Sequence, residues 1–346
     1  MLQTALGSDK MKKSLDSIDI AKFIGSVLVF TMHFNPLSDY KYVSIIPQIL
    51  ARWGVPFFFV CSAFFLFNKS ADGNIDRDTI NIYIYRIGSL YAVWLVYNIP
   101  NVIYSRLYSK DLSAVSTWLV FIKNSVLSST FTGSWYLASS IFSAWFVYLL
   151  SKKFKTKTIL GITAVFYLLC VFTSAYFGVL PQGIKKVLTF LCFPLNIFNG
   201  CFYFAIGKYI AENKQVVFKK IDKRRAMTGF IIFYSIFVVE TALSTYFKVL
   251  GSTDIAFSTV LMSVSLFLFC LQANVKINHG LLLRKLSIII YCCQGNVLLV
   301  NGLVKNTFKV PSILAFVISS IIAAGICVVV LYIQKHTHWK WSKYLT

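Results

Sequence analysis

Residues 18–33 of the chain read IDIAKFIGSVLVFTMH. The segment is mostly apolar, but it contains three ionisable residues, Asp19, Lys22 and His33. Each residue of a helix turns by about 100°, so these three side chains share one face and leave the other face apolar. Ionisable groups within a membrane are costly, and they normally face a bundle interior or a wet cavity. The segment therefore predicts a membrane-embedded helix whose polar stripe, about 16 Å long between Lys22 and His33, points inward.

The whole chain has the composition of an integral membrane protein. Of its 346 residues 57% are hydrophobic and 13% are charged, against about 25% charged in an ordinary soluble domain. Apolar segments near the length of a membrane span recur from end to end. This pattern excludes a soluble enzyme, a fibrous protein and a disordered chain. We expect one all-α integral membrane domain over residues 1–346, with no appended soluble domain and ten spans at about 17–34, 53–67, 83–104, 135–151, 158–177, 187–210, 229–249, 255–273, 284–304 and 311–333.

The net charge of +22 indicates membrane topology and not nucleic-acid binding. Most of the 34 lysines and arginines fall in the tails and in alternate loops, on the side where the N-terminus lies. The positive-inside rule then places both termini in the cytoplasm. We interpret the densest clusters, residues 152–157 and 219–225, as topology signals that contact anionic membrane lipids. The alternative is that some of them attract a polyanionic cytosolic ligand such as a coenzyme.

The eight cysteines form no CxxC pair and no Cys/His cluster with metal-ligand spacing. They fall in or beside apolar segments, which is typical of small packing residues. We therefore expect neither a metal site nor a disulfide framework.

The polar stripe allows both a chemical and a structural interpretation. An imidazole in an apolar site stays neutral and can accept a proton, so His33 is a candidate general base. The alternative for His33 is a histidine at a helix end that bonds to a carbonyl. For Asp19 and Lys22 the alternative is an interfacial ion pair whose lysine extends along the helix toward water. The common face of all three residues favours a shared site.

The pattern Asp19-x-x-Lys22, ten residues, His33 resembles the first helix of the membrane acyltransferase-3 superfamily, where arginine is usual at the position of Lys22. Further segments resemble the family in the same order, with Gln294 standing where the family has histidine. They are Arg52–Phe64, Tyr85-Arg86-Ile87, Trp135-Tyr136-Leu137, Phe198-Asn199-Gly200 followed by Gly207, and Leu286–Gln294. Residues 33–37, followed by VPFF, are particularly similar to the membrane half of the vancomycin-resistance serine racemases, which is assigned to serine uptake.

The resemblance implies an acyltransferase that uses acyl-CoA, usually acetyl-CoA, as a donor substrate and holds no permanent cofactor. In that reaction His33 would be the general base or an acyl relay, Lys22 would hold an anionic group of the donor or the oxyanion, and Asp19 would orient Lys22. Arg86 would bind coenzyme phosphate, or it is simply a positive-inside anchor. Glu240, which lies mid-span, would relay protons or pair with Lys22. The alternative for Glu240 is a protonated carboxyl hydrogen-bonded between helices.

The motifs also supply candidates for the walls of a substrate cavity. Each of these residues, taken alone, is also compatible with simple packing. They are Ser62, Trp135, Tyr136, Asn199, Ser287, Tyr291 and Gln294.

The resemblance therefore predicts a multi-pass protein of a bacterial cytoplasmic membrane. It would transfer an acetyl group from acetyl-CoA to a hydroxyl of a cell-surface polysaccharide or a lipid-linked sugar. The sequence specifies no oligomeric state. One alternative is a transporter of a small solute such as serine, or of a glycan, because intramembrane charges can couple to protons. Another is a catalytically inactive subunit of a polysaccharide assembly complex, which the departures at Lys22 and Gln294 motivate.

Overall fold

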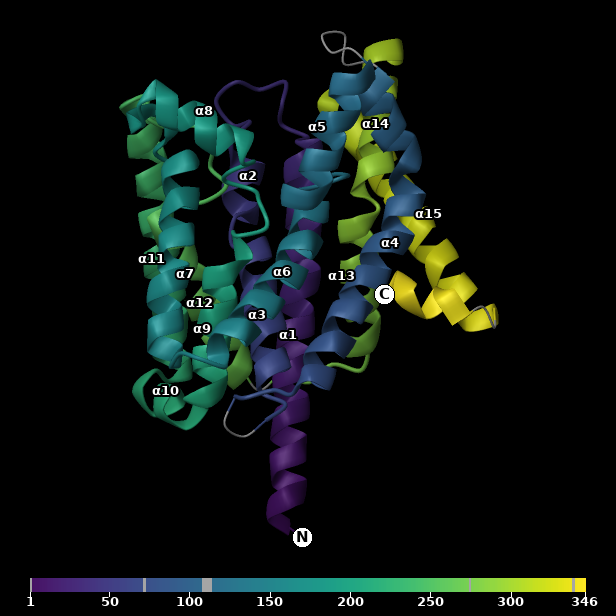
Figure 1. Cartoon of the computed structure of the whole chain (residues 1–346). Helices are drawn as coiled ribbons and strands as arrows, with labels where there is room; N and C mark the ends of the chain where they lie inside the picture. Colours follow the sequence, from purple (N-terminus) through teal and green to yellow (C-terminus); the bar gives the residue numbers. More distant parts are fainter. Residues whose placement is uncertain (1, 71–72, 108–113, 274, 338–339) are drawn as a thin grey trace.

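The computed structural model describes residues 2–70, 73–107, 114–273, 275–337 and 340–346, and every regular element within them is a helix. The expectation of an all-α chain is thus confirmed for the described residues. Most helices stand side by side in a bundle, and the first turns of α1 (Leu2–Phe34) extend beyond it (Figure 1). The others are α2 (Ile46–Ala51), α3 (Gly54–Phe67), α4 (Arg77–Leu107), α5 (Ala114–Leu127), α6 (Ser134–Ser151), α7 (Thr156–Thr173), η1 (Phe177–Val179), α8 (Gln182–Phe190), α9 (Gly200–Glu212), α10 (Lys214–Lys220), α11 (Lys223–Tyr246), α12 (Phe257–Gln272), α13 (Gly280–Cys292), α14 (Gln294–Phe308), α15 (Ser312–His336) and η2 (Lys340–Leu345).

The length and hydropathy of the helices in the described residues do not confirm the ten spans that we predicted. The segments long and apolar enough to cross a membrane number five, or six if the bent pair α13 and α14 is one span. The helices α4 and α6 stand where spans are expected, but they do not meet this standard of length and hydropathy. An apolar run in a sequence does not distinguish a membrane crossing from a helix buried inside the bundle. The five are residues 16–34, 46–67, 156–173, 223–246 and 312–336.

The expected span at 187–210 is wrong as a single helix, because it is divided between α8 and α9. Pro194 in the intervening stretch lacks an N–H donor and disfavours a helical residue before it. Asn196 bonds to two backbone groups of the same stretch, at 3.2 and 3.1 Å, and so satisfies part of its irregular backbone. The break places Asn199 just before α9, where it faces a pocket.

The expected span at 284–304 is bent by 53° between α13 and α14. Asn98 of α4 bridges the bend. Its Nδ2 donates to the carbonyl of Cys292 at 3.1 Å, and its Oδ1 accepts from the N–H of Asn296 at 3.1 Å. A side chain thus pairs backbone groups on both sides of the bend, as irregular backbone in an apolar environment requires.

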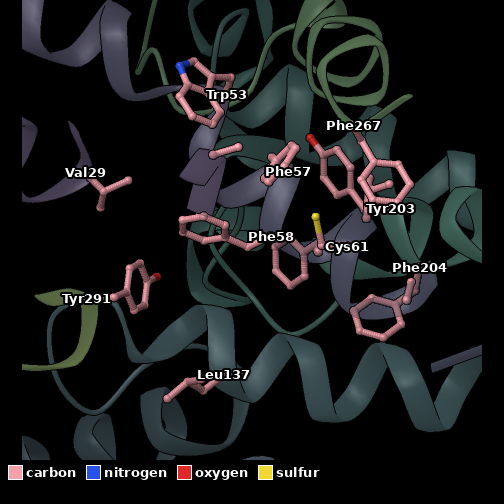
Figure 2. Packing of buried hydrophobic residues seen from close by; sticks show 14 of the residues in the cluster. Val29, Trp53, Phe57, Phe58, Cys61, Leu137, Tyr203, Phe204, Phe267 and Tyr291 are labelled. Carbon is pink, nitrogen blue, oxygen red and sulfur yellow. The ribbon is translucent and has the colours of Figure 1, made fainter. Parts of the chain in front are cut away.

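The core is built around α3, whose aromatic side chains are almost fully buried. Figure 2 shows Phe57 and Phe58 of α3 with Phe267 of α12 and Tyr203 of α9. The rings of Phe57 and Phe267 lie 6.1 Å apart, nearly edge to face. On the α9 side, a Cβ added at Gly207 would stand only 2.5 Å from the Cβ of Ala63. Small residues therefore let α3 and α9 approach closely.

Two basic clusters lie at one end of the bundle. The cluster 152–157 leads into α7, and the cluster 219–225 joins α10 to α11. Thr156 Oγ1 donates to Glu212 Oε1 at 2.9 Å, which joins the start of α7 to the end of α9. Figure 1 shows α10 at the end from which the start of α1 extends. We call this the basic end and the other the opposite end. That the basic end is cytoplasmic stays a prediction from the positive-inside rule.

A buried lysine fastens the loop between α3 and α4 at the basic end. Lys208 is 1% exposed, and its Nζ lies 2.7 Å from Glu212 Oε1 and donates to the carbonyl of Gly73 at 2.8 Å. Gly73 has a φ of +71°, a conformation that favours glycine. These contacts hold the loop that also carries Lys69 at the edge of a large pocket.

Candidate functional site

Most of the predicted site residues meet in one pocket at the basic end, with a volume of about 340 Å³. We call it the basic-end pocket. Its walls come from α1, α3, α4, α6 and α13, so distant parts of the sequence contribute to it. The predicted residues that line it are Asp19, Lys22, Ser62, Arg86, Tyr136, Ser287 and Tyr291.

The partner of Asp19 differs from the one we expected. The Asp19 carboxylate, 3% exposed, accepts hydrogen bonds from Arg284 of α13, with Nε 2.9 Å from Oδ1 and Nη2 2.8 Å from Oδ2. These contacts do not support our prediction that Asp19 orients Lys22. Sequence reasoning missed Arg284, because nothing local indicates which side of α13 packs on α1.

The close approach of α13 to α1 has visible supports. Ser287 Oγ donates to the carbonyl of Lys22 at 3.1 Å, and it lies 2.8 Å from Ser26 Oγ. A Cβ added at Gly280 would stand 2.7 Å from a carboxylate oxygen of Asp16, so a side chain there would require that carboxylate to move. Ser287 therefore joins helices as well as lining the pocket.

Lys22 faces the basic-end pocket without an acidic partner. Among the described residues no carboxylate lies within 4 Å of its Nζ, which instead sits 5.9 Å from the centroid of the Phe65 ring. Lys69 and Arg86 line the same pocket and likewise have no carboxylate within 4 Å among those residues. With Arg284 the walls carry four cationic groups against the single carboxylate of Asp19. The pocket is therefore strongly electropositive and suits a ligand with several negative charges.

His33 opens into a second, smaller pocket at the opposite end, with a volume of about 60 Å³. We call it the opposite-end pocket. The imidazole is exposed to this space, and no described residue forms a hydrogen bond with it. The predicted residues Trp135, Asn199 and Tyr291 also line the pocket. An unbonded imidazole next to open space is free to exchange a proton with a substrate.

The opposite-end pocket also contains polar groups that we did not predict as site residues. Arg52 forms an ion pair with Asp254, and its Nε donates to Thr253 Oγ1 at 2.9 Å. Tyr203 is 1% exposed, and its hydroxyl has no hydrogen-bond partner among the described residues. The Oδ1 of Asn199, a residue that we did predict, also lacks a hydrogen-bond partner among the described residues. Buried polar atoms normally find partners, so these two atoms are exceptions beside the pocket.

A layer of aromatic rings lies between the two pockets. Tyr291 lines both of them, and its ring centroid is 5.6 Å from that of Tyr136 and 6.1 Å from that of Phe58. Its hydroxyl donates to the carbonyl of Gly133 at 2.9 Å, and the hydroxyls of Tyr136 and Ser62 lie 3.1 Å apart. Figure 2 shows the rings of Tyr291 and Phe58. Lys22 and His33 therefore share a helix face but open into different spaces.

The structure places Glu240 away from both pockets. Its carboxylate accepts from the backbone N–H groups of Phe257 and Ser258 at 2.9 and 3.1 Å, at the start of α12. It also accepts from the Ser258 hydroxyl at 2.6 Å and from the Tyr176 hydroxyl at 3.0 Å. These contacts cap a helix, since a carboxylate suits the positive end of the helix dipole. They join α11 to α12 and do not reach Lys22.

Gln294, which we predicted in the cavity wall, lines neither pocket. It is fully buried at the bend between α13 and α14. Both amide atoms lack hydrogen-bond partners within the described part of the chain. It stands beside the bend that Asn98 bridges.

Comparison with known proteins relates the chain to a family of acyltransferases. A family model described as an acyltransferase domain matches residues 15–332. An amino-acid racemase of Enterococcus faecalis is 27% identical over 234 residues, which cover 65% of this chain, and a second racemase of that organism is 22% identical over 222 residues, which cover 59%. The matched regions span only 31% of each racemase. No solved structure matches the chain.

Proposed function

The chain belongs to the acyltransferase-3 family, and we propose that it moves an acetyl group from acetyl-CoA to a hydroxyl of a cell-surface polysaccharide or a lipid-linked sugar. The observation that carries this proposal is the pair of pockets along α1, one electropositive and one containing His33, with an aromatic layer between them. A bacterial cytoplasmic membrane is the proposed location.

The basic-end pocket is the proposed donor site. Coenzyme A carries several phosphate charges. The pocket offers Lys22, Lys69 and Arg86, none of which has a carboxylate within 4 Å among the described residues. Charge-assisted hydrogen bonds to phosphate are about twice as strong as neutral ones. If the basic end is cytoplasmic, it also faces the compartment that supplies the coenzyme. The acyl arm would extend toward the aromatic layer of Phe58, Tyr136 and Tyr291.

The opposite-end pocket is the proposed acceptor site. His33 would take the proton of the attacking hydroxyl while its oxygen forms a bond to the thioester carbonyl carbon. The carbon–sulfur bond then breaks, and coenzyme A leaves as a thiolate that is reprotonated. A pocket of about 60 Å³ admits a hydroxyl group and not a whole sugar, so the rest of the acceptor would stay outside. Asn199 and Tyr203, which line the pocket, would orient that group.

A transporter is the second candidate, and one observation of the structure favours it. The helix pair α13 and α14 is bent beside the fully buried Gln294. Discontinuous helices with polar groups at the break are typical of substrate sites in transporters. In that case the solute would be a small polar molecule such as serine, or a glycan.

The deciding experiment uses purified protein in proteoliposomes with acetyl-CoA labelled in its acetyl group. We would measure coenzyme A release and label transfer to added glycan fractions, and compare the wild type with His33→Ala. His336→Ala is the matched control, because His336 is exposed, stacks on Tyr332 and lines neither pocket.

Label transfer that disappears in His33→Ala and persists in His336→Ala would support the proposal. If folded wild-type protein turned over no coenzyme A with any glycan fraction, the acyltransferase proposal would fail. Serine uptake would then be the next assay.

A further inference from the structure

The guanidinium of Arg284 is held rigidly at the edge of the basic-end pocket. It forms a two-bond fork with Asp19, at 2.9 and 2.8 Å, and the side chain of Asp19 is 4% exposed. A guanidinium carries five N–H donors, of which this fork uses two. The Arg284 side chain is 40% exposed and lines the pocket. Three donors thus remain for a ligand on a side chain whose position is already fixed.

The neighbouring cation cannot supply the same geometry. Lys22 presents one ammonium group on a flexible stem, whereas arginine presents a planar fork that matches two oxygens of a phosphate. Lys22, Lys69 and Arg86 add positive charge around the pocket, but neither lysine offers a fork. Arg86 is exposed and has no carboxylate that fixes it among the described residues. Among the described residues, Arg284 is therefore the one cationic side chain of the basic-end pocket that a carboxylate holds in place for anion binding.

We infer that Arg284 binds a phosphate group of the acyl donor and that Asp19 is the positioning residue that holds it. The inference rests on the proposed function, since it names the residue that recognises the donor of that reaction. It also assigns Asp19 a different role from the orientation of Lys22 that we predicted. A phosphate would receive two hydrogen bonds from the fixed guanidinium and further attraction from the Lys22 ammonium.

The test measures binding of coenzyme A and of pantetheine, which carries no phosphate, to protein in phosphatidylcholine nanodiscs. The variants are Arg284→Lys, Arg284→Gln and the double variant Asp19→Asn with Arg284→Gln. The double variant is needed because Arg284→Gln alone leaves the buried Asp19 charge unpaired, which destabilises a protein. Lys285→Gln is the matched control. It removes a charge one residue away, where Nζ donates to Gln334 Oε1 at 3.0 Å outside the pocket.

We expect the double variant to bind coenzyme A about tenfold to a hundredfold more weakly, the range of lost charge-assisted hydrogen bonds. Its affinity for pantetheine should not change, which a general structural defect would not reproduce. Arg284→Lys should keep part of the affinity, because it keeps the charge and loses the fork. In turnover it should raise KM for acetyl-CoA and leave kcat nearly unchanged, because it removes binding far from the reacting carbonyl.

The outcomes separate this inference from the proposed function. Wild-type protein that binds no coenzyme A would refute both. If the double variant bound coenzyme A as tightly as the wild type, the role of Arg284 would be refuted. The proposed function would still stand. The lipid phosphatidylglycerol, added to the nanodiscs, tests the other source of a phosphate. If Arg284→Gln changed only the binding of this lipid, the site would belong to a lipid headgroup and the assignment to the acyl donor would be wrong.

Discussion

The basic-end and opposite-end pockets lie along one face of α1, yet they differ in size and in how their charges are balanced. The first, of about 340 Å³, has four cationic groups and one carboxylate. In the second, of about 60 Å³, Arg52 is paired with Asp254, and His33 has no bonded partner among the described residues. Excess charge suits the capture of a large anion, whereas a small space with an unbonded base suits chemistry on one hydroxyl. The difference fits our proposal that one pocket binds the donor and the other holds the reacting hydroxyl.

The largest expected effect comes from removing the base. His33→Ala should lower kcat by about 10² to 10⁴, the usual contribution of general acid–base catalysis. Coenzyme A binding should stay as in the wild type, because the proposed donor site lies on the other side of the aromatic layer. Single-turnover kinetics and equilibrium binding would check both parts. A variant that lost binding as well would show that the two pockets are not separate in function.

The next effect concerns Lys22, one of the three cations of the basic-end pocket that have no carboxylate within 4 Å among the described residues. Lys22→Met should raise KM for acetyl-CoA about tenfold or more and change kcat less, because it removes a charge-assisted contact made before and during reaction. Lys335→Met is the control, since Lys335 is exposed and lines neither pocket. A large fall in kcat with KM unchanged would instead place Lys22 at the oxyanion.

A smaller effect is expected at the boundary between the pockets. Tyr291→Ala removes the ring that lines both of them and should raise hydrolysis of acetyl-CoA without acceptor severalfold, because water reaches the thioester. Tyr291→Phe removes only the hydrogen bond to the carbonyl of Gly133 and should leave this leak low. Coenzyme A release measured without glycan tests the pair. Equal leakage in both variants would contradict a role for the ring as a barrier.

Variants of Glu240 test whether its carboxylate stabilises the fold or takes part in catalysis. Glu240→Ala should lower the free energy of unfolding by about 0.5–2 kcal/mol, the usual cost of a lost N-terminal helix cap. Activity at a temperature where the variant is folded should stay near that of the wild type. Thermal unfolding and turnover would be measured on the same sample. If Glu240→Gln kept the stability and lost the activity, our prediction of a catalytic role from the sequence would be right.

The smallest effect concerns a loop at the opposite end. Hydrogen bonds from the side chain and the backbone of Ser312 hold the pKa of Asp39 below its ordinary value of 3.8, and the charge of Lys305 acts in the same direction. The resulting stability is present above that ordinary value and is lost as the pH falls through the lowered pKa. Asp39→Asn should unfold at a slightly lower temperature near pH 7 and show less further loss below pH 4. Thermal unfolding at both pH values checks this expectation.

The sequence predicted the helical class and much of the site because both depend on local patterns. The spacing of Asp19, Lys22 and His33 places them on one face of any helix, and α1 is a helix. Our hydropathy-based prediction missed the interruption of the expected span at 187–210, because a hydropathy window averages over the single Pro194. Nor could the sequence predict that Glu240 caps α12, since that contact depends on the packing of α11 against α12.

What the sequence by itself determined is a membrane bundle of the acyltransferase-3 family, because composition and motif order are properties of the chain alone. Only the tertiary structure decided which charges pair. Asp19 and Lys22 are three residues apart, yet the carboxylate bonds to Arg284 and leaves the lysine open to the pocket. Proximity along a helix makes a contact available, but a guanidinium held by helix packing offers the carboxylate two aligned hydrogen bonds. The packing of α13 on α1 therefore sets the electrostatics of the site.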